Sequence, residues 1–251
     1  MPRKRFIHLL LTRFSVKIAG GRCKERGWLE HRFELFERFC FPSLFTQSCQ
    51  NFRWLVFLDS SLPPDLRLRM DEHARKFPRL LPVYVPEFFT QTIARRSVAP
   101  LLQGHEYLIT SRLDNDDGLA TRFIETVQGR FEEQAFEFIN LPHGFVFSGR
   151  NVYSWSHPAN PFISLIERSA NFQTVLCGCH ADLLKLGPVQ QVEETPGWLQ
   201  VVHGQNLANG VKGVPVKADE WSRYFSIYPA CLSDRPVETG RAPFQLAPGS
   251  V

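Results

Sequence analysis

Leu113-Asp114-Asn115-Asp116-Asp117-Gly118 lies near the middle of the chain and follows the apolar run Tyr107-Leu108-Ile109-Thr110. Burying ionised carboxylates without partners costs several kcal/mol, so the cluster indicates a polar site beyond a buried strand. Residues two apart on an extended strand point to the same face. If the strand end stays extended, the side chains of Asp114 and Asp116 can converge on one bound species. A hard divalent cation, which prefers oxygen ligands, is suited to that position. The alternative is a polar turn in which an Asp caps a helix beginning near Leu119.

Apolar runs and helical patterns alternate through the first half of the chain. Strands are expected at 6–11, 53–59, 81–85 and 105–111, and helices at 29–45, 63–77, 91–102 and 119–128. This alternation predicts an α/β fold with a mostly parallel central sheet and helices on both faces. Ligands of such sheets bind beyond the carboxyl ends of the strands. Arg13, Asp59 and Asp114 all lie at such ends, which indicates one common site.

The second half of the chain has a different pattern. Short β-like runs are expected at 136–141, 144–148, 153–155, 162–166 and 198–203, with one short helix at 181–186. We therefore predict a single domain over 1–233, made of a nucleotide-binding-type half (1–130) and an additional β-rich half (131–233). The Pro- and Gly-rich segment 234–251 is expected to be a flexible tail.

Composition narrows the class of protein. The chain has 251 residues, 43% of them hydrophobic, which suffices for one sizeable domain. A net charge of +4 from scattered basic residues argues against a nucleic-acid-binding protein and is compatible with anionic substrates or an anionic lipid surface. The six cysteines lack zinc-site spacing, and the apolar run 6–11 is too short for a signal core or a membrane span. These features predict a cytoplasmic protein with reduced thiols.

Four segments together resemble one family. They are Thr12-Arg13-Phe14, the run 52–59, the segment 110–117 and Trp198-x4-His203-x2-Asn206. The chain from Phe6 to Leu207 resembles the bacterial rhamnosyltransferase family, whose members look like GT-A-fold glycosyltransferases. The Arg-x-Asp-Asn-Asp-Asp piece is the most specific of the four.

The resemblance implies a donor site. Arg13 and Asp59 would line the nucleotide site, and Asp114 and Asp116 would be the first and third positions of an Asp-x-Asp motif. Late in the chain, His203 would complete the coordination of Mn²⁺ or Mg²⁺ by Asp114 and Asp116. A histidine nitrogen among oxygen ligands shifts the preference towards Mn²⁺.

Other candidates come from the residues themselves. Arg112 could contact a phosphate, or could be a structural partner of the aspartates. An inverting transfer needs a carboxylate or imidazole to take the proton of the acceptor hydroxyl. Glu193, Glu194 and His180 are candidate bases, and each is also an ordinary surface residue in the alternative interpretation. For Asp117, capping of the next helix is expected.

The function predicted from these features is metal-dependent glycosyl transfer. A sugar such as rhamnose or another deoxyhexose would move from a nucleotide-diphosphate sugar to a glycan or lipid-linked acceptor. This would serve bacterial surface polysaccharide synthesis, at the inner face of the membrane. One alternative is a metal-dependent phosphodiesterase or nuclease, which would need further acidic or histidine ligands. Another is a non-catalytic carbohydrate-binding protein, which predicts no affinity for nucleotides.

Overall fold

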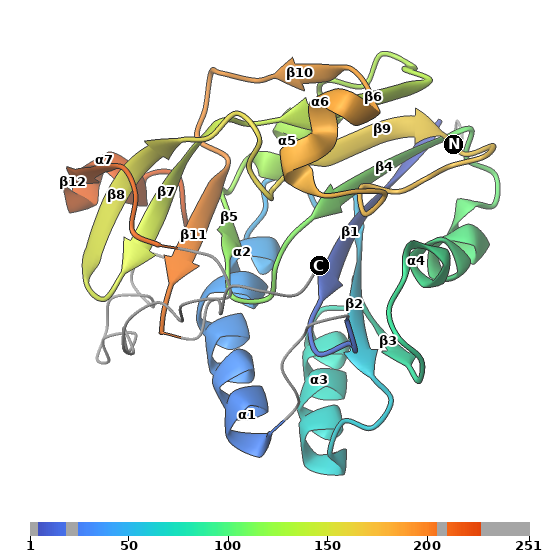
Figure 1. Ribbon diagram of the computed structural model, residues 1–251, viewed down its shortest axis with the longest axis horizontal. Helices are drawn as coiled ribbons and strands as arrows, with labels where there is room; N and C mark the ends of the chain where they lie inside the picture. The colour runs from blue at the N-terminus through green and yellow to red at the C-terminus, as the bar shows by residue number, and fades with distance from the viewer. Residues whose placement is uncertain (1–4, 19–24, 205–209, 227–251) are drawn as a thin grey trace, which may run out of the picture.

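Two β-sheets form the framework of the protein, seen in a computed structural model that describes residues 5–18, 25–204 and 210–226 (Figure 1). The larger sheet has the strand order β10-β6-β9-β4-β1-β2-β3, and the smaller one β12-β8-β7-β11-β5. The expected tail at 234–251 lies outside the described residues. Among the residues that are described, no helix is long and apolar enough to cross a membrane.

The larger sheet is mostly parallel, as predicted. Its parallel core consists of β1 (Phe6–Arg13), β2 (Arg53–Asp59), β3 (Leu80–Val85) and β4 (Tyr107–Arg112). At one edge β10 (Val189–Gln191) runs parallel to β6 (Phe136–Asn140). Between them and the core lies β9 (Ser164–Arg168), which is antiparallel to both β4 and β6. Strands after residue 130 thus complete the sheet that the first half begins.

Helices cover both faces of this sheet, which confirms the predicted fold class. One face holds α1 (Arg26–Leu35), η1 (Phe36–Cys40), α2 (Phe41–Phe45), α3 (Pro64–Lys76) and α5 (Phe123–Gln128); the other holds α4 (Gln91–Val98) with η2 (Ala99–Leu102). Successive strand residues serve opposite faces, so Leu10 packs in the first core while Leu9 and Leu11 pack in the second. Each such buried leucine contributes roughly 1.5–3 kcal/mol.

The helix expected at 29–45 continues past Pro42 because a π-helical turn precedes this proline. Proline has no N–H and its ring clashes with the carbonyl four residues earlier. The turn η1 before it is π-helical, with the Phe41 N–H donating to the Phe36 carbonyl. The wider turn accommodates the proline, and α2 then packs Leu44 into the core.

The smaller sheet consists of β5 (Gly118–Leu119), β7 (His143–Ser148), β8 (Asn151–Ser156), β11 (Trp198–Val202) and β12 (Val214–Val216), with α7 (Ala218–Ser222) packed on it. The predicted β-rich half at 131–233 does not form a sheet of its own, because β6, β9 and β10 join the larger sheet and β5 of the smaller sheet comes from before residue 130. A helix beginning near Leu119 was wrong, because Gly118 and Leu119 pair antiparallel with β11 and α5 begins only at Phe123. The short segments η3 (His180–Asp182) and α6 (Leu183–Leu186) match the helix expected at 181–186.

Candidate functional site

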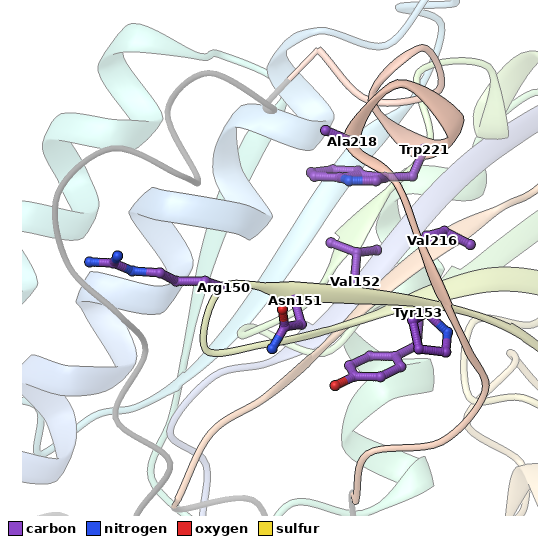
Figure 2. Close-up of a pocket in the computed structure, with 8 residues that line it drawn as sticks. Arg150, Asn151, Val152, Tyr153, Val216, Ala218 and Trp221 are labelled. Atoms are coloured by element: carbon purple, nitrogen blue, oxygen red, sulfur yellow. The ribbon is translucent and has the colours of Figure 1, made fainter.

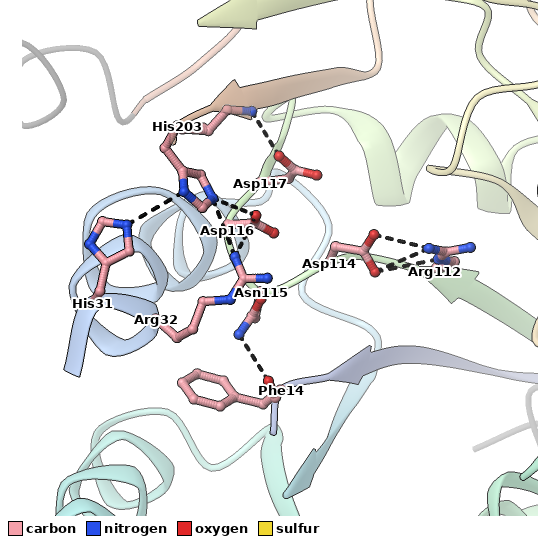
Figure 3. A network of polar contacts seen from close by, with 10 residues as sticks. Phe14, His31, Arg32, Arg112, Asp114, Asn115, Asp116, Asp117 and His203 are labelled. Atoms are coloured by element: carbon pink, nitrogen blue, oxygen red, sulfur yellow. Dashed lines mark hydrogen bonds and ion pairs between the residues drawn. The ribbon is translucent and has the colours of Figure 1, made fainter. Parts of the chain in front are cut away.

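The aspartate segment forms a turn between the two sheets. β4 ends at Arg112, and the Asp117 N–H donates to the Asp114 carbonyl over 3.3 Å. The Asn115 amide fixes the turn to the segment after β1 by donating to the Phe14 carbonyl over 3.2 Å. The expectation of an extended strand end was therefore wrong. Because the chain turns, the side chains of Asp114 and Asp116 point to different partners (Figure 3).

Asp116 lies at the centre of a buried polar cluster (Figure 3). Its Oδ2 accepts from Arg32 Nη1 at 2.6 Å and lies 3.0 Å from His203 Nε2. The Asp116 side chain is 7% exposed and that of His203 is fully buried. Beyond His203, the ring nitrogen His31 Nε2 is 3.5 Å from His203 Nδ1. Helix α1, the aspartate turn and the end of β11 thus meet at one point.

The charge on Asp116 is stabilised by these neighbours. Burial alone would raise the pKa of this carboxyl, but the positive charge of Arg32 and the hydrogen bond from His203 outweigh burial and lower its pKa to about 2. Asp116 is therefore an ionised, buried carboxylate at neutral pH. A carboxylate in this state is suited to hold a cation.

Asp117 has a structural role, and the expectation that it caps the next helix was wrong. Its Oδ1 accepts the Val201 N–H at 2.7 Å, which joins the turn to β11. Burial, and after it the charges of Asp116 and Asp114, raise the pKa of Asp117 well above its ordinary value. Asp117 thus fixes the distance between the aspartate turn and the strand that presents His203.

Arg112, Asp114 and Arg13 form a second cluster at the carboxyl ends of β4 and β1. Arg112 Nη2 donates to Asp114 Oδ2 at 3.0 Å, and the Asp114 side chain is 33% exposed. Burial and the nearby charge of Arg112 lower the pKa of Arg13, while Asp114 raises it. Arg13 thus lies within electrostatic range of both Arg112 and its carboxylate partner. The surplus of positive charge is suited to bind an anion such as a diphosphate.

Asp59 ends β2 and its side chain is 1% exposed. Its Oδ1 accepts from both the N–H and the hydroxyl of Ser61, each at 2.7 Å. Lys17 Nζ lies 3.7 Å from Oδ2. Asp59 therefore holds the turn after β2, at the same edge as Arg13, and a contact with the nucleotide stays a prediction.

Two of the candidate bases lie far from Asp116. Glu193 pairs with His143 at 2.7 Å, at the beginning of β7, and Glu194 pairs with Arg130 at 2.9 Å. β7 and β11 run parallel, so His143 marks the end of the smaller sheet opposite His203. His143 accepts from the N–H of Gly197, six residues before His203, so at roughly 3.3 Å per residue the two ends are about 20 Å apart.

The third candidate base, His180, lies beside the Ala159 carbonyl and the His157 ring. Its ring Nδ1 donates to the Ala159 carbonyl at 2.6 Å, which leaves Nε2 with an acceptor lone pair. Burial lowers the pKa of Arg112, but Asp114, Asp117 and Cys179 raise it, so the residue before His180 lies within electrostatic reach of Arg112.

The Asp116–His203 pair has the spacing that a divalent cation requires. Two ligands at right angles, each about 2.1 Å from a cation, are about 3.0 Å apart, and Asp116 Oδ2 and His203 Nε2 are 3.0 Å apart. No group of three His, Cys, Asp or Glu able to hold a metal occurs in the described part of the chain. The pair therefore fits a cation whose other ligands are phosphate oxygens and water, provided that Arg32 moves aside.

Sequence reasoning missed Arg32. It follows Trp28 by four residues, and its guanidinium lies 5.3 Å from the Trp28 ring centre. This spacing puts the two side chains on one face of a helix, beside the buried stripe of Leu29 and Phe33. Nothing in the local pattern distinguishes Arg32 from Arg26, the other arginine of this helix, because the partners of Arg32 come from distant segments.

A separate cavity of about 290 Å³ lies on the smaller sheet (Figure 2). It is bounded by β8, β12 and α7, and the side chains of Arg150, Asn151, Tyr153 and Trp221 are among those lining it. The turn between β7 and β8 follows Ser148, which pairs with Val202. The cavity therefore lies towards the same end of the smaller sheet as His203.

Comparison with solved structures finds distant similarity. The S. aureus protein TarS, residues 1–349, is 12% identical with a TM-score of 0.46, and the match covers 78% of this chain and 60% of that TarS chain. Its complex with UDP-GlcNAc is 12% identical with a TM-score of 0.48, covering 87% and 64%. A 4-diphosphocytidyl-2C-methyl-D-erythritol synthase from Anaerococcus prevotii is 9% identical with a TM-score of 0.42, covering 76% and 90%. This chain thus spans less than two thirds of the TarS chain.

Comparison at the level of sequence is decisive for the family. No curated protein matches the chain. The family model described as "Putative rhamnosyl transferase" matches residues 8–214, a stretch that includes most of β1, the aspartate turn and His203. The chain belongs to this rhamnosyl transferase family.

Proposed function

We propose that the protein is a nucleotide-sugar-dependent glycosyltransferase. It transfers rhamnose or another deoxyhexose to a glycan or lipid-linked acceptor, in bacterial surface polysaccharide synthesis. Membership of the rhamnosyl transferase family supports the type of reaction. The observation that carries the proposal is the ionised Asp116 with His203 at 3.0 Å, next to the arginine cluster at the carboxyl edge of the parallel sheet.

The donor's diphosphate would lie between these two clusters. Asp116 and His203 would hold Mn²⁺ or Mg²⁺, which, when bound, neutralises charge on the departing diphosphate. Arg13 and Arg112 supply further positive charge for the phosphates. Asp114 keeps one third of its side-chain surface exposed and could accept hydrogen bonds from the ribose.

The acceptor would bind against the smaller sheet. The cavity lined by Arg150, Asn151 and Tyr153 offers polar groups and an apolar wall, which suits a sugar ring. For the proton of the acceptor hydroxyl, His180 is the candidate that the geometry favours, because its Nδ1 is already bonded and Nε2 is available as a base. Glu193 and Glu194 lie at the other end of the sheet.

A donor-hydrolysis assay tests this proposal. The protein is incubated with UDP-, dTDP- and GDP-sugars in the presence of Mn²⁺, and release of the nucleoside diphosphate is measured. At least one donor should be hydrolysed slowly, and Asp116→Asn should abolish the release. Asp65→Asn, which alters an exposed acid paired with Arg26 on the surface, is the matched control and should keep it. Cleavage of a phosphodiester substrate with no release from any sugar donor would instead support the phosphodiesterase alternative.

A further inference from the structure

Arg32 occupies the position that a cation would take. Its Nη1 lies 2.6 Å from Asp116 Oδ2 and 3.3 Å from His203 Nε2, so one guanidinium nitrogen contacts both atoms of the pair. A divalent cation bound to the same two atoms on the side where Arg32 lies would overlap this nitrogen. Two positive charges at this distance would also repel each other strongly in a buried site. On that side of the pair, Arg32 in this position and a metal ion exclude each other.

The contacts of Arg32 allow it to leave this position. The buried Nε atom of Arg32 has no hydrogen-bond partner among the described residues, so the guanidinium is only partly satisfied where it lies. Its side chain is 14% exposed and borders the Trp28 ring. Displacement thus costs mainly the ion pair with Asp116, and the freed guanidinium can form charge-assisted hydrogen bonds with an anion.

We propose that Arg32 and a divalent cation compete for the Asp116–His203 pair, so that Arg32 couples metal binding to arrival of the donor diphosphate. Without nucleotide, Arg32 neutralises Asp116 and keeps metal affinity low. A diphosphate favours the metal-bound state in two ways, because its oxygens complete the coordination and its charge attracts the released guanidinium. By linkage, the metal strengthens nucleotide binding by the same factor as the nucleotide strengthens metal binding. This inference rests on the metal-binding part of the proposed function.

Mn²⁺ titration followed by electron paramagnetic resonance of the free ion tests the competition. Dissociation constants are measured with and without UDP for the parent, Arg32→Gln, Arg32→Lys and Arg26→Gln. Arg26→Gln makes the same charge change on the exposed part of the same helix. We expect Arg32→Gln to bind Mn²⁺ about tenfold more tightly than the parent without UDP, and UDP to improve that affinity much less than in the parent. Arg32→Lys keeps the charge and should stay near the parent, as should Arg26→Gln.

The outcomes separate this inference from the metal site itself. If Arg32→Gln binds Mn²⁺ no more tightly than the parent while Asp116→Asn loses binding, competition by Arg32 is refuted and the metal site stands. If no form binds Mn²⁺ even with UDP, the metal part of the proposed function fails, and this inference fails with it. Should Arg32→Gln unfold, a parent-like Mn²⁺ affinity for a folded Arg32→Met would overturn the inference in the same way.

Discussion

Asp114 and Asp116 are two residues apart, yet we expect their substitutions to weaken the binding of different ligands. Asp116 faces Arg32 and His203, whereas Asp114 faces Arg112 (Figure 3). Asp116→Asn removes one of the two protein ligands of the proposed cation. Asp114→Asn leaves that pair intact and removes a carboxylate expected to bind the ribose. The first change should therefore act on metal affinity and the second on nucleotide affinity.

The structure sets the magnitudes. Losing a charge-assisted hydrogen bond to the ribose costs about 1.5–3 kcal/mol, so Asp114→Asn should weaken UDP binding by roughly 10- to 150-fold. Its effect on Mn²⁺ affinity without nucleotide should stay below about threefold, because Asp114 is partly exposed and already neutralised by Arg112. Asp116→Asn should lower Mn²⁺ affinity by about 100-fold or more, since removal even of a group supporting a metal ligand costs about 10- to 100-fold.

Asp116→Asn should also lower stability, and the pH dependence follows from the pKa. The pKa of Asp116 falls from an ordinary 3.8 to about 2 on folding, which corresponds to about 2 kcal/mol of stabilisation at neutral pH. A depressed pKa gives stability that is present above about pH 4 and is lost as the pH falls through about 2. Urea unfolding measures this loss. Titration calorimetry with Mn²⁺ and with UDP measures the two affinities, and equal loss of Mn²⁺ affinity in both variants would refute the division of roles.

Three further predictions concern the framework. Burial lowers the pKa of His8 to about 3, so the free energy of unfolding should fall by about 2 kcal/mol between about pH 6.5 and 5, where His8 of the unfolded chain takes up a proton. In urea unfolding, the variant His8→Gln should lack this fall. The same pH dependence in the variant and the parent would contradict the prediction. Gly144→Ala should cost about 1–3 kcal/mol or more, because an added Cβ would lie 2.1 Å from the Trp198 ring; an unchanged melting temperature would refute that packing. Asp59→Ala should cost about 1–3 kcal/mol by leaving the Ser61 N–H and hydroxyl without their acceptor; loss of UDP affinity at unchanged stability would instead make Asp59 a nucleotide-binding residue.

The sheet could be predicted from local patterns because the apolar runs of its strands are local. β2 begins and ends at the predicted residues, and β1, β3 and β4 lie within two residues of the predicted starts and ends. Leu119 was misassigned to a helix because the strand character of Gly118–Leu119 depends on pairing with β11, about 80 residues later. A two-residue strand carries no periodicity of its own.

The site was harder to predict, for the same reason. His203 at a strand end was identified through the family resemblance, and the structure places it against Asp116. The turn that separates Asp114 from Asp116 is fixed by Asn115 and Asp117, which bond to distant backbone groups. The role of Arg32 depends on contacts with Asp116 and His203, which are distant in the sequence. Local spacing can locate carboxylates at a sheet edge, but it cannot identify the positively charged side chain that pairs with each of them.

Anomalous scattering from crystals grown with Mn²⁺ and UDP tests the central claim most directly. The account predicts one manganese peak between Asp116 and His203, roughly 2.1 Å from Oδ2 and from Nε2, with the Arg32 guanidinium moved away and UDP phosphate oxygens completing the coordination. A peak at another place in the protein, or UDP bound at the carboxyl edge with Arg32 still in contact with Asp116 and no manganese beside it, would contradict the account.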